Sequence, residues 1–356
     1  MTAPTAPTAP TALADEPRPD SLLARLAPPD PALADRLRHG LAHAETRLRE
    51  VAADVPDARV AEWSRYLIEA GGKRLRPLLV LLAAEFGAAP PPADRSDRVL
   101  DAAVMVELIH VASLHHDDVM DGARSRHGVP SAPARWGNRT AVHLGNRLLS
   151  RAARLAADLG GEVVGLQGGA TERLVRGQLR ELTGPAAGES PLTHHFAVIA
   201  DKTASLISLA LRVGGTAADV PAPVVRALAG YGEYLGIVFQ LSDDLLDFAA
   251  DPAESGKDTG TDLAVGVRTL PVLLALSEDG PRAAELRRLL EGGPLADEGG
   301  RRRAAELLRS STAEARAREL LHSYAADARD ALSALPDVPA RAALDALVGV
   351  VEHRSS

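Results

Sequence analysis

The sequence predicts an all-α fold, a single large helical bundle around a deep central cavity. From Pro31 onward the chain is dominated by alanine, leucine, arginine and glutamate, of which most are strong helix formers. Aromatic residues make up only 3% of the 356 residues, and the alternating β-branched pattern typical of strands is scarce. The cavity is indicated by two acidic stripes described below.

The chain divides into a tail and one domain. Residues 1–30 begin with a repeated Thr-Ala-Pro unit, which cannot build a hydrophobic core. We therefore expect a disordered Ala/Pro/Thr-rich tail at 1–30 and a helical domain at 31–356. Glycine and proline clusters predict the ends of the helices in that domain, and these clusters are Gly71-Gly72, Ala88–Ala93, Gly122–Pro133, Gly160-Gly161, Gly184–Pro191, Gly214-Gly215, Asp251–Gly260 and Gly292–Gly300.

The composition excludes several kinds of site and partner. The chain has no cysteine, so a metal must be bound by oxygen or nitrogen ligands. It has 48 acidic against 40 basic residues, and the net charge of -8 argues against nucleic acid as a partner. There is no run of about 18 apolar residues and no basic segment followed by an apolar one at the amino terminus. We expect no transmembrane segment, no signal peptide and a cytoplasmic location.

Two acidic segments with the same spacing are the main clue to function. They read DDVMD at 117–121 and DDLLD at 243–247, and both lie in apolar stretches. On a helix, the first and last aspartates of each segment project from one face. Like charges at this spacing destabilise a helix by roughly 0.2–0.5 kcal/mol per pair, so a ligand must offset the cost. A hard divalent cation is the natural candidate.

Each acidic segment lies on a helix that could line a pocket. Between Val99 and Asp121, one helical stripe is apolar at its start, small in its middle and acidic at its end, and it consists of Val106, His110, Ser113, Asp117 and Asp121. This pattern predicts a deep pocket with a metal site at its mouth. The run from Tyr231 to Phe248 repeats the design, and two such helices facing each other would form a metal site in the bundle core.

Basic segments accompany the acidic ones. They are GGKRLRP at 71–77, Arg124-Ser125-Arg126-His127 and Lys202-Thr203. Arginine and lysine side chains pair with phosphate oxygens, while magnesium bridges other phosphate oxygens to carboxylates. A diphosphate held above a deep apolar pocket suggests a prenyl diphosphate substrate.

With these acidic and basic segments, the chain resembles the trans-isoprenyl diphosphate synthases, also called polyprenyl synthetases, from about residue 60 to the carboxyl end. The resemblance depends on five motifs in the family's order: GGKRLRP at 71–77, ELIHVASLHHDDVMD at 107–121, DKTASLI at 201–207, FQLSDDLLDF at 239–248 and GKDTGTDL at 256–263. It implies the isoprenoid synthase type of helical bundle and a homodimer. The implied reaction condenses an allylic prenyl diphosphate with isopentenyl diphosphate, head to tail, to give a trans product.

The resemblance also implies roles for individual residues. Three Mg2+ ions per active site would be bound by the six aspartates Asp117, Asp118, Asp121, Asp243, Asp244 and Asp247. The catalytic residues would be Asp117, Asp121, Asp243 and Lys202. Isopentenyl diphosphate would be bound by Lys73, Arg76, His110 and His127. The allylic diphosphate would be bound by Arg126, Lys202, Thr203, Gln240 and Lys257.

In this family the residues just before the first acidic segment set the product length. Bulky aromatic residues there form the floor of the pocket in short-chain enzymes, whereas this chain has Ala112 and Ser113. Small side chains leave the pocket open, and the next possible floor is formed by Ile109, Val106 and Met105. We expect a geranylgeranyl or longer polyprenyl diphosphate.

The chain departs from the family pattern at three places. The family's Arg-Arg-Gly reads Arg126-His127-Gly128, and its Gly-Asp reads Gly145-Asn146. The Gly-Lys before Thr-Leu-Pro reads Gly266-Val267-Arg268, where Arg268 is the nearest cation. Histidine at 127 lacks the bidentate fork of arginine, and its charge depends on pH.

The sequence leaves two other functions open. An enzyme that keeps the allylic diphosphate site but lacks the second substrate site would ionise and cyclise one prenyl diphosphate, as class I terpene synthases do. The presence of Lys73, Arg76 and His110 favours elongation instead. A non-catalytic partner subunit would be expected to lose acidic motifs, and this chain has both.

Overall fold

The computed structural model confirms the all-α fold and describes residues 19–28, 30–87, 93–249, 268–291, 295 and 297–355. The first half contains α1 (Pro19–Leu26), α2 (Pro31–Ala53), α3 (Ala58–Glu69), α4 (Leu75–Ala84), α5 (Ala93–Met120), β1 (Ser125–Arg126), β2 (Val129–Pro130), α6 (Ala132–Trp136), α7 (Asn138–Leu159) and α8 (Gly161–Thr183). The second half contains α9 (Pro191–Ile199), the π-helical turn η1 (Ala200–Ala204), α10 (Ser205–Ala217), α11 (Ala222–Ala249), α14 (Leu270–Leu276), α15 (Pro281–Glu291), α16 (Glu298–Arg309), α17 (Ala313–Leu332), α18 (Pro339–Glu352) and the 3-10 turn η2 (His353–Ser355).

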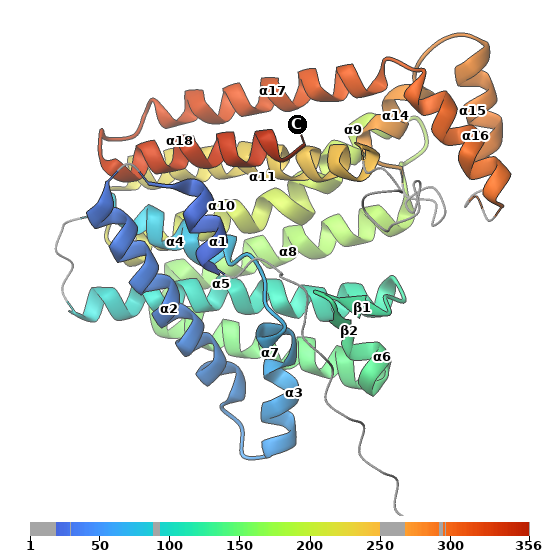
Figure 1. The fold of residues 1–356 in the computed structure, drawn as a ribbon. Coiled ribbons are helices and arrows are strands. Elements are labelled where there is room, and N and C mark those ends of the chain that lie inside the picture. Colours follow the sequence, from blue (N-terminus) through green and yellow to red (C-terminus); the bar gives the residue numbers. More distant parts are fainter. Residues whose placement is uncertain are drawn as a thin grey trace, which may run out of the picture.

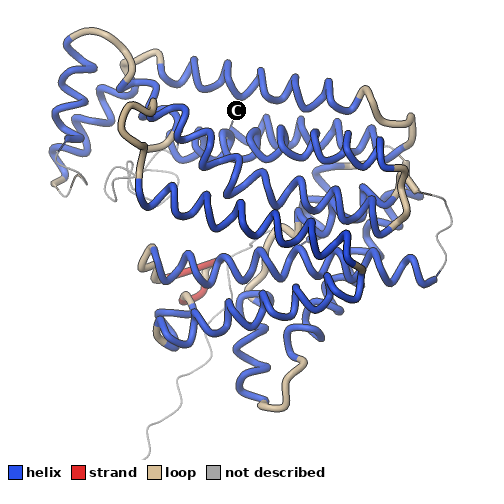
Figure 2. Tube along the Cα trace, turned by 180° about the vertical axis from the view of Figure 1, so that it is seen from behind, coloured by secondary structure: helices blue, strands red, loops and turns tan. Residues whose placement is uncertain are grey.

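The helix α10 lies at the centre of the bundle. It packs against α4, α5, α8 and α11, and α17 and α18 cover α11 on the outside. The helices α5 and α11 run in the same direction and end at the side of the bundle that carries the hairpin of β1 and β2 (Figures 1 and 2). Both acidic segments therefore lie at this end.

Local sequence signals explain several helix starts. Asp30 accepts a hydrogen bond from Ala32 N at 2.8 Å, and Pro31 occupies the first turn of α2. Asp57 caps α3 in the same way, with Arg59 N at 2.9 Å. Along α2, buried leucines recur about once per turn and turn one apolar face toward the bundle.

The predicted tail at 1–30 is wrong for its last part. Pro19–Leu26 forms α1, and its Leu23 and Leu26 are buried in the core. The helix packs on α2 and α18, and three of its apolar side chains, Leu22, Leu23 and Leu26, lie in or against the core. Residues 1–18 lie outside the described part of the chain.

The predicted break at Gly214-Gly215 is also wrong, because α10 continues to Ala217. A Cβ atom on Gly214 would lie 2.3 Å from the carbonyl oxygen of Val80. Gly214 therefore serves the close approach of α10 to α4 and does not end the helix. The break expected at Asp251–Gly260 lies outside the described residues, as do residues 292–294 and 296 of the break expected at Gly292–Gly300.

Among the described helices, the segment Ser96–Met120 is long and apolar enough to meet the length and composition criteria for a membrane span. In the folded chain 67% of its most apolar window is buried. This segment is the main part of α5, which packs against α2, α4, α7 and α10. A core helix of a bundle satisfies the same criteria.

Candidate active site

The first acidic segment ends α5. The backbone N–H of Asp121 donates to the carbonyl of Asp117 at 2.8 Å, so the last helical turn continues through both residues. Burial raises the pKa of Asp117, and the nearby Lys202 opposes this shift. Asp118 is fully buried and turns toward the hairpin, where Arg126 donates to its Oδ1 from Nε at 2.9 Å and from Nη2 at 2.6 Å.

The second acidic segment ends α11, and its three aspartates have different surroundings. Asp243 accepts a hydrogen bond from Arg354 Nη2 at 2.5 Å, and burial raises its pKa against the opposing effect of Arg354. Asp244 is buried and accepts hydrogen bonds from Gln240 Nε2 and from the backbone N–H of Leu270, both at 3.0 Å. Its Oδ2 also lies 3.1 Å from His195 Nε2. Asp247 is exposed.

The turn η1 presents Lys202 and Thr203 between the two acidic segments. Lys202 pairs with Glu181 of α8, and Thr203 Oγ1 donates to Gln240 Oε1 at 3.0 Å. The backbone of η1 is tightly enclosed, because a Cβ on Gly177 would lie 2.7 Å from Lys202 N and one on Gly236 would lie 2.3 Å from Ala204 Cα. A π-helical turn widens the helix locally and is common at functional sites.

The segment GGKRLRP at 71–77 turns around a buried arginine. Arg74 is in the left-handed region at φ 48 and begins α4. Its guanidinium bonds Glu45 at 2.6 Å, Glu107 at 3.1 Å and the carbonyl of Ile68 at 2.6 Å. These bonds fix the turn that leads from α3 into α4. Lys73 Nζ lies 5.9 Å from the centre of the Phe239 ring and also acts electrostatically on Asp243.

Basic side chains gather around His110. Burial lowers the pKa of His110 well below its usual value, and the charges of Arg76 and His127 lower it further, with smaller effects from Arg74 and Arg126. His127 lies in the two-residue turn between β1 and β2, where Ser125 pairs with Pro130. Both turn residues have positive φ, 49 for His127 and 74 for Gly128, as a type I′ hairpin turn requires. The sequence thus brings four predicted isopentenyl diphosphate residues, Lys73, Arg76, His110 and His127, to one end of the bundle.

An apolar cavity begins at the first acidic segment. It has a volume of about 270 Å³ and lies between α5, α7 and α8. Its walls are formed by Ile109, Ser113, His116, Asp117, Met120, Leu149, Thr171, Leu174, Val175, Gln178, Leu179 and Leu182. Of the two predicted length-determining residues, Ser113 lines this cavity, whereas Ala112 is fully buried and is not among the lining residues. Ile109 lies one turn deeper than Ser113, while Val106 and Met105 are buried elsewhere in the core.

Several neighbours of the site were missed by the sequence analysis. Glu181 forms an ion pair with Lys202, and Arg354 forms one with Asp243. Arg74 fixes the turn of the basic segment 71–77. Arg74 lies in the motif GGKRLRP at 71–77. By contrast, no nearby residues in the sequence indicate the role of Arg354, because its partner Asp243 is distant in the sequence. Lys257, Gly266 and Val267 lie outside the described residues. Asn146 replaces a family aspartate in α7, and nothing in the structure explains this change.

The carboxylates fit magnesium in their chemistry. In the described part of the chain, no group of three or more His, Cys, Asp or Glu side chains is close enough to hold a metal ion. Magnesium commonly binds through one or two carboxylates together with substrate phosphates and water. Asp118 Oδ2 is buried and has no hydrogen-bond partner among the described residues. A hard cation shared with a diphosphate is consistent with this donor set.

Comparisons with known proteins agree with the resemblance. The family described as polyprenyl synthetase matches residues 57–307. The nonaprenyl diphosphate synthase of Mycobacterium tuberculosis is 42% identical over 336 residues, which are 94% of this chain and 98% of that protein. The structure of geranylgeranyl pyrophosphate synthase from Corynebacterium glutamicum, complexed with calcium and isoprenyl diphosphate, is 37% identical at a TM-score of 0.81, and the match covers 92% of this chain and 98% of that one.

A decaprenyl diphosphate synthase from Rhodobacter capsulatus is similar to the same extent. It has a TM-score of 0.82 and 35% identity, with 91% of this chain and 99% of that chain covered. The predictions of family, fold and enzyme class are thus confirmed. The chain belongs to the polyprenyl synthetase family and is a trans-polyprenyl diphosphate synthase, an enzyme that transfers prenyl groups.

Proposed function

We propose that the allylic diphosphate is bound between the two acidic segments and that its prenyl chain extends into the cavity. The observation that carries this proposal is the cavity itself, which begins at Asp117 and is lined mostly by apolar side chains. Asp117, Asp121 and Asp243, with Asp118, Asp244 and Asp247 assisting, would hold three Mg2+ ions. When bound, these ions neutralise the charge that develops on the leaving diphosphate.

The remaining allylic diphosphate contacts come from cations and hydroxyl groups. Lys202 lies near Asp117 and would exchange its contact with Glu181 for a phosphate oxygen. Thr203 and Gln240 already contact each other, which supports a common role. Arg126 would contribute from the hairpin, and Lys257 completes the proposed set.

Isopentenyl diphosphate would be bound on the opposite side by Lys73, Arg76, His110 and His127. The surroundings of His110 support this assignment: burial lowers its pKa most, the charges of Arg76 and His127 lower it further, and an anion bound beside them would balance these cations. His110 remains neutral in such surroundings and donates or accepts a hydrogen bond without adding charge. His127, which stands where the family has an arginine, lies in the same cluster of basic side chains around His110.

The reaction then requires no protein nucleophile. The C–O bond of the allylic diphosphate breaks, and the electron pair leaves with the diphosphate. The double bond of isopentenyl diphosphate attacks the allylic cation and forms the new C–C bond, and a proton is lost to the released diphosphate. The chain's contribution is to hold both diphosphates at the correct distance, to stabilise charge and to enclose the cation in an apolar cavity.

We infer a geranylgeranyl or longer product from the cavity wall. Ser113 is small and lies one turn below Asp117, so an elongating chain can pass it and reach Ile109. The long-chain products in the names of several relatives, nonaprenyl and decaprenyl diphosphate, are consistent with this direction.

We also infer a homodimer. The outer face of α8 carries Val175, Leu179 and Leu182, each more than half exposed, and Val164 lies on the same helix at 43% exposure. Exposed large aliphatic residues on one helix mark an interaction surface. Since the first three also line the cavity, a second copy of the chain would both cover this face and close the cavity. We keep the cytoplasm as the proposed location.

Elongation is tested by incubating the enzyme with Mg2+ and farnesyl diphosphate, with and without isopentenyl diphosphate. Products are analysed as free hydrocarbons and, after dephosphorylation, as alcohols. We expect prenyl alcohols of twenty or more carbons that appear only with both substrates. Hydrocarbon formed from farnesyl diphosphate alone would instead establish a cyclase. The variant Lys73→Ala should raise the KM for isopentenyl diphosphate more than that for the allylic substrate.

A further inference from the structure

Four side chains form a cluster where α3, the hairpin and α6 meet. Trp63 and Trp136 have ring centres 5.5 Å apart, and Tyr66 meets the ring of Trp136 edge to face at 4.8 Å. The guanidinium carbon of Arg135 lies 4.7 Å from the centre of the Tyr66 ring and 4.9 Å from that of Trp136. We call these residues, Trp63, Tyr66, Arg135 and Trp136, the aromatic clasp.

The clasp is bonded directly to the hairpin backbone. Tyr66 Oη donates to the carbonyl of Pro130 at 2.8 Å. Pro130 pairs with Ser125 in the two-stranded ladder, and Ser125 is followed directly by Arg126. Ser131, which caps α6, donates from its backbone N–H to the carbonyl of Arg124 at 3.0 Å. Tyr66 therefore holds the hairpin from the side of α3, while Arg126 bonds it to Asp118 of α5.

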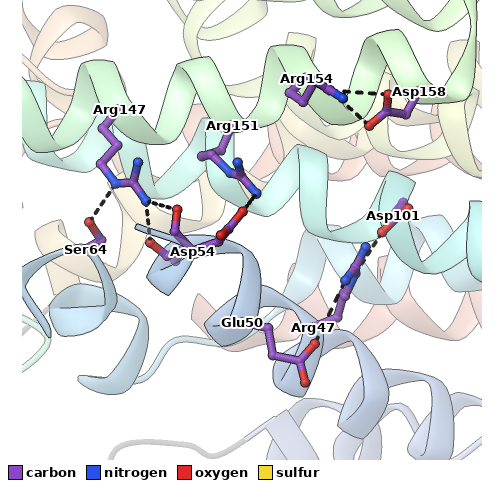
Figure 3. A network of polar contacts seen from close by, with 10 residues as sticks. Arg47, Glu50, Asp54, Ser64, Asp101, Arg147, Arg151, Arg154 and Asp158 are labelled. Atoms are coloured by element: carbon purple, nitrogen blue, oxygen red, sulfur yellow. Dashed lines mark hydrogen bonds and ion pairs between the residues drawn. The ribbon is translucent and has the colours of Figure 1, made fainter. Parts of the chain in front are cut away.

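The helix that carries Tyr66 is itself anchored from its other side. Arg147 of α7 donates to Ser64 Oγ at 3.2 Å and to the carbonyl of Asp54 at 2.8 Å (Figure 3). Arg151, one turn further along α7, pairs with the carboxylate of Asp54 at 2.6 Å (Figure 3). These bonds fix α3 and the end of α2 on α7, so Tyr66 projects from a fixed support.

The clasp joins the two parts of the proposed isopentenyl diphosphate site. The helix α3 ends at Glu69 and leads directly into Gly71-Gly72-Lys73. A Cβ on Gly72 would lie 3.8 Å from Cε1 of His127 in the hairpin turn, so the two segments face each other. One helix thus supports the Lys73 segment covalently and the His127 segment through Tyr66.

We infer that the aromatic clasp sets the spacing between these two segments and that Tyr66 is a positioning residue for the diphosphate of the second substrate. The inference rests on the proposed function, because it assumes that Lys73 and His127 contact isopentenyl diphosphate. Tyr66 touches no reacting atom and acts only through the hairpin.

The variant Tyr66→Phe tests the inference, since it keeps the ring contacts and removes one hydrogen bond. We expect the KM for isopentenyl diphosphate to rise about three- to tenfold, with kcat and the KM for the allylic substrate nearly unchanged. The variant Arg135→Gln, at the exposed side of the clasp, should change the same KM in the same direction by a smaller factor. Tyr234→Phe, on the exposed side of α11, is the matched control and should leave both KM values at the wild-type level.

Tryptophan fluorescence gives a second readout. The chain has two tryptophans, and both belong to the clasp. Titration of the enzyme with isopentenyl diphosphate alone should change the emission, and Tyr66→Phe should shift the midpoint of the titration to higher concentration. An unchanged KM for isopentenyl diphosphate in Tyr66→Phe, or an equal rise in both KM values, would overturn the inference. If Lys73→Ala leaves that KM unchanged as well, it is the proposed substrate site that fails.

Discussion

Arg354, in the last turn of the chain, donates to Asp243 at 2.5 Å and lies 4.5 Å above the centre of the Phe239 ring. Its side chain is only 9% exposed, so the carboxyl end of the chain closes over the second acidic segment. This guanidinium supplies positive charge beside Asp243, and the charge of Lys73 adds to it. Its hydrogen bond occupies Oδ1 of Asp243, an oxygen that the proposed magnesium site would use.

The variant Arg354→Ala should therefore bind divalent metal more tightly in the absence of substrate. Removing a competing cation from one carboxylate is expected to lower the Kd about two- to tenfold. Titration calorimetry with Mg2+, or electron paramagnetic resonance with Mn2+, measures the change. Arg354→Lys, which keeps the charge, should show less of the effect, and Arg302→Ala on the surface should show none. Weaker metal binding in Arg354→Ala would contradict this competition.

Product length should respond to Ser113 and not to Ala112. Phenylalanine at 113 would project into the cavity one turn below Asp117, so Ser113→Phe is expected to shift the products to shorter chains. Ser113→Ala, which keeps a small side chain, is the control. Ala112→Phe would overpack a fully buried position, with an expected loss of about 1–3 kcal/mol in stability. Chromatography of the dephosphorylated products measures the change in length, and thermal melts measure the loss of stability. Unchanged products in Ser113→Phe would exclude Ser113 as a length determinant.

The turn that carries Lys202 should lose stability in acid. Asp201 accepts hydrogen bonds from Arg176 Nε and Nη2, both at 2.8 Å, and from Arg173 Nε at 3.3 Å. These bonds, chiefly those from Arg176, lower the pKa of Asp201 below its usual 3.8. A lowered pKa means that the folded state binds the proton less readily than the unfolded state. The stabilisation is therefore complete above pH 3.8 and is lost as the pH falls through the lower folded-state pKa.

Asp201→Asn removes this titrating group. At pH 7 we expect the variant to be less stable by about 1–3 kcal/mol, because it loses charge-assisted hydrogen bonds. The difference should shrink as the pH falls below 4, because Asp201 takes up a proton in the unfolded wild-type chain before it does so in the folded one. Urea unfolding at a series of pH values measures both free energies. A difference that stays constant from pH 7 to pH 3 would show that the charge of Asp201 is not the cause.

The parts of the site that the sequence could predict are those made by local spacing. Asp117 and Asp121 fall on one helical face because a helix repeats every 3.6 residues, and this spacing has the same effect in any fold in which the segment is helical. The Arg354–Asp243 pair could not be predicted, since it depends on how α18 returns over α11. Gly214 was misread for a related reason. A glycine that ends a helix and one that admits a neighbouring backbone look alike in a sequence, and only the position of Val80 distinguishes them.

The proposed dimer should depend on the outer face of α8. Val164→Glu would place a charge on that face without altering the cavity wall, because Val164 is not among the lining residues. We expect the wild-type enzyme to be a dimer and the variant to be largely monomeric, with a loss of activity at low protein concentration. Light scattering coupled to size-exclusion chromatography measures the mass. Glu162→Gln, on the same helix, is the control, and a wild-type monomer would contradict the homodimer.

His127 should be the weakest part of the second substrate site. An arginine at this position would offer a permanent charge and a bidentate fork to the diphosphate, whereas the charge of a histidine depends on pH. His127→Arg is therefore expected to lower the KM for isopentenyl diphosphate severalfold and to make it less dependent on pH between 6 and 8. The gain is limited by the backbone, since residue 127 has φ 49, a left-handed conformation in which histidine is more common than most residues. Steady-state kinetics at several pH values measure the effect, with His143→Arg on α7 as the control. A higher KM in His127→Arg would mean that the hairpin is shaped for histidine.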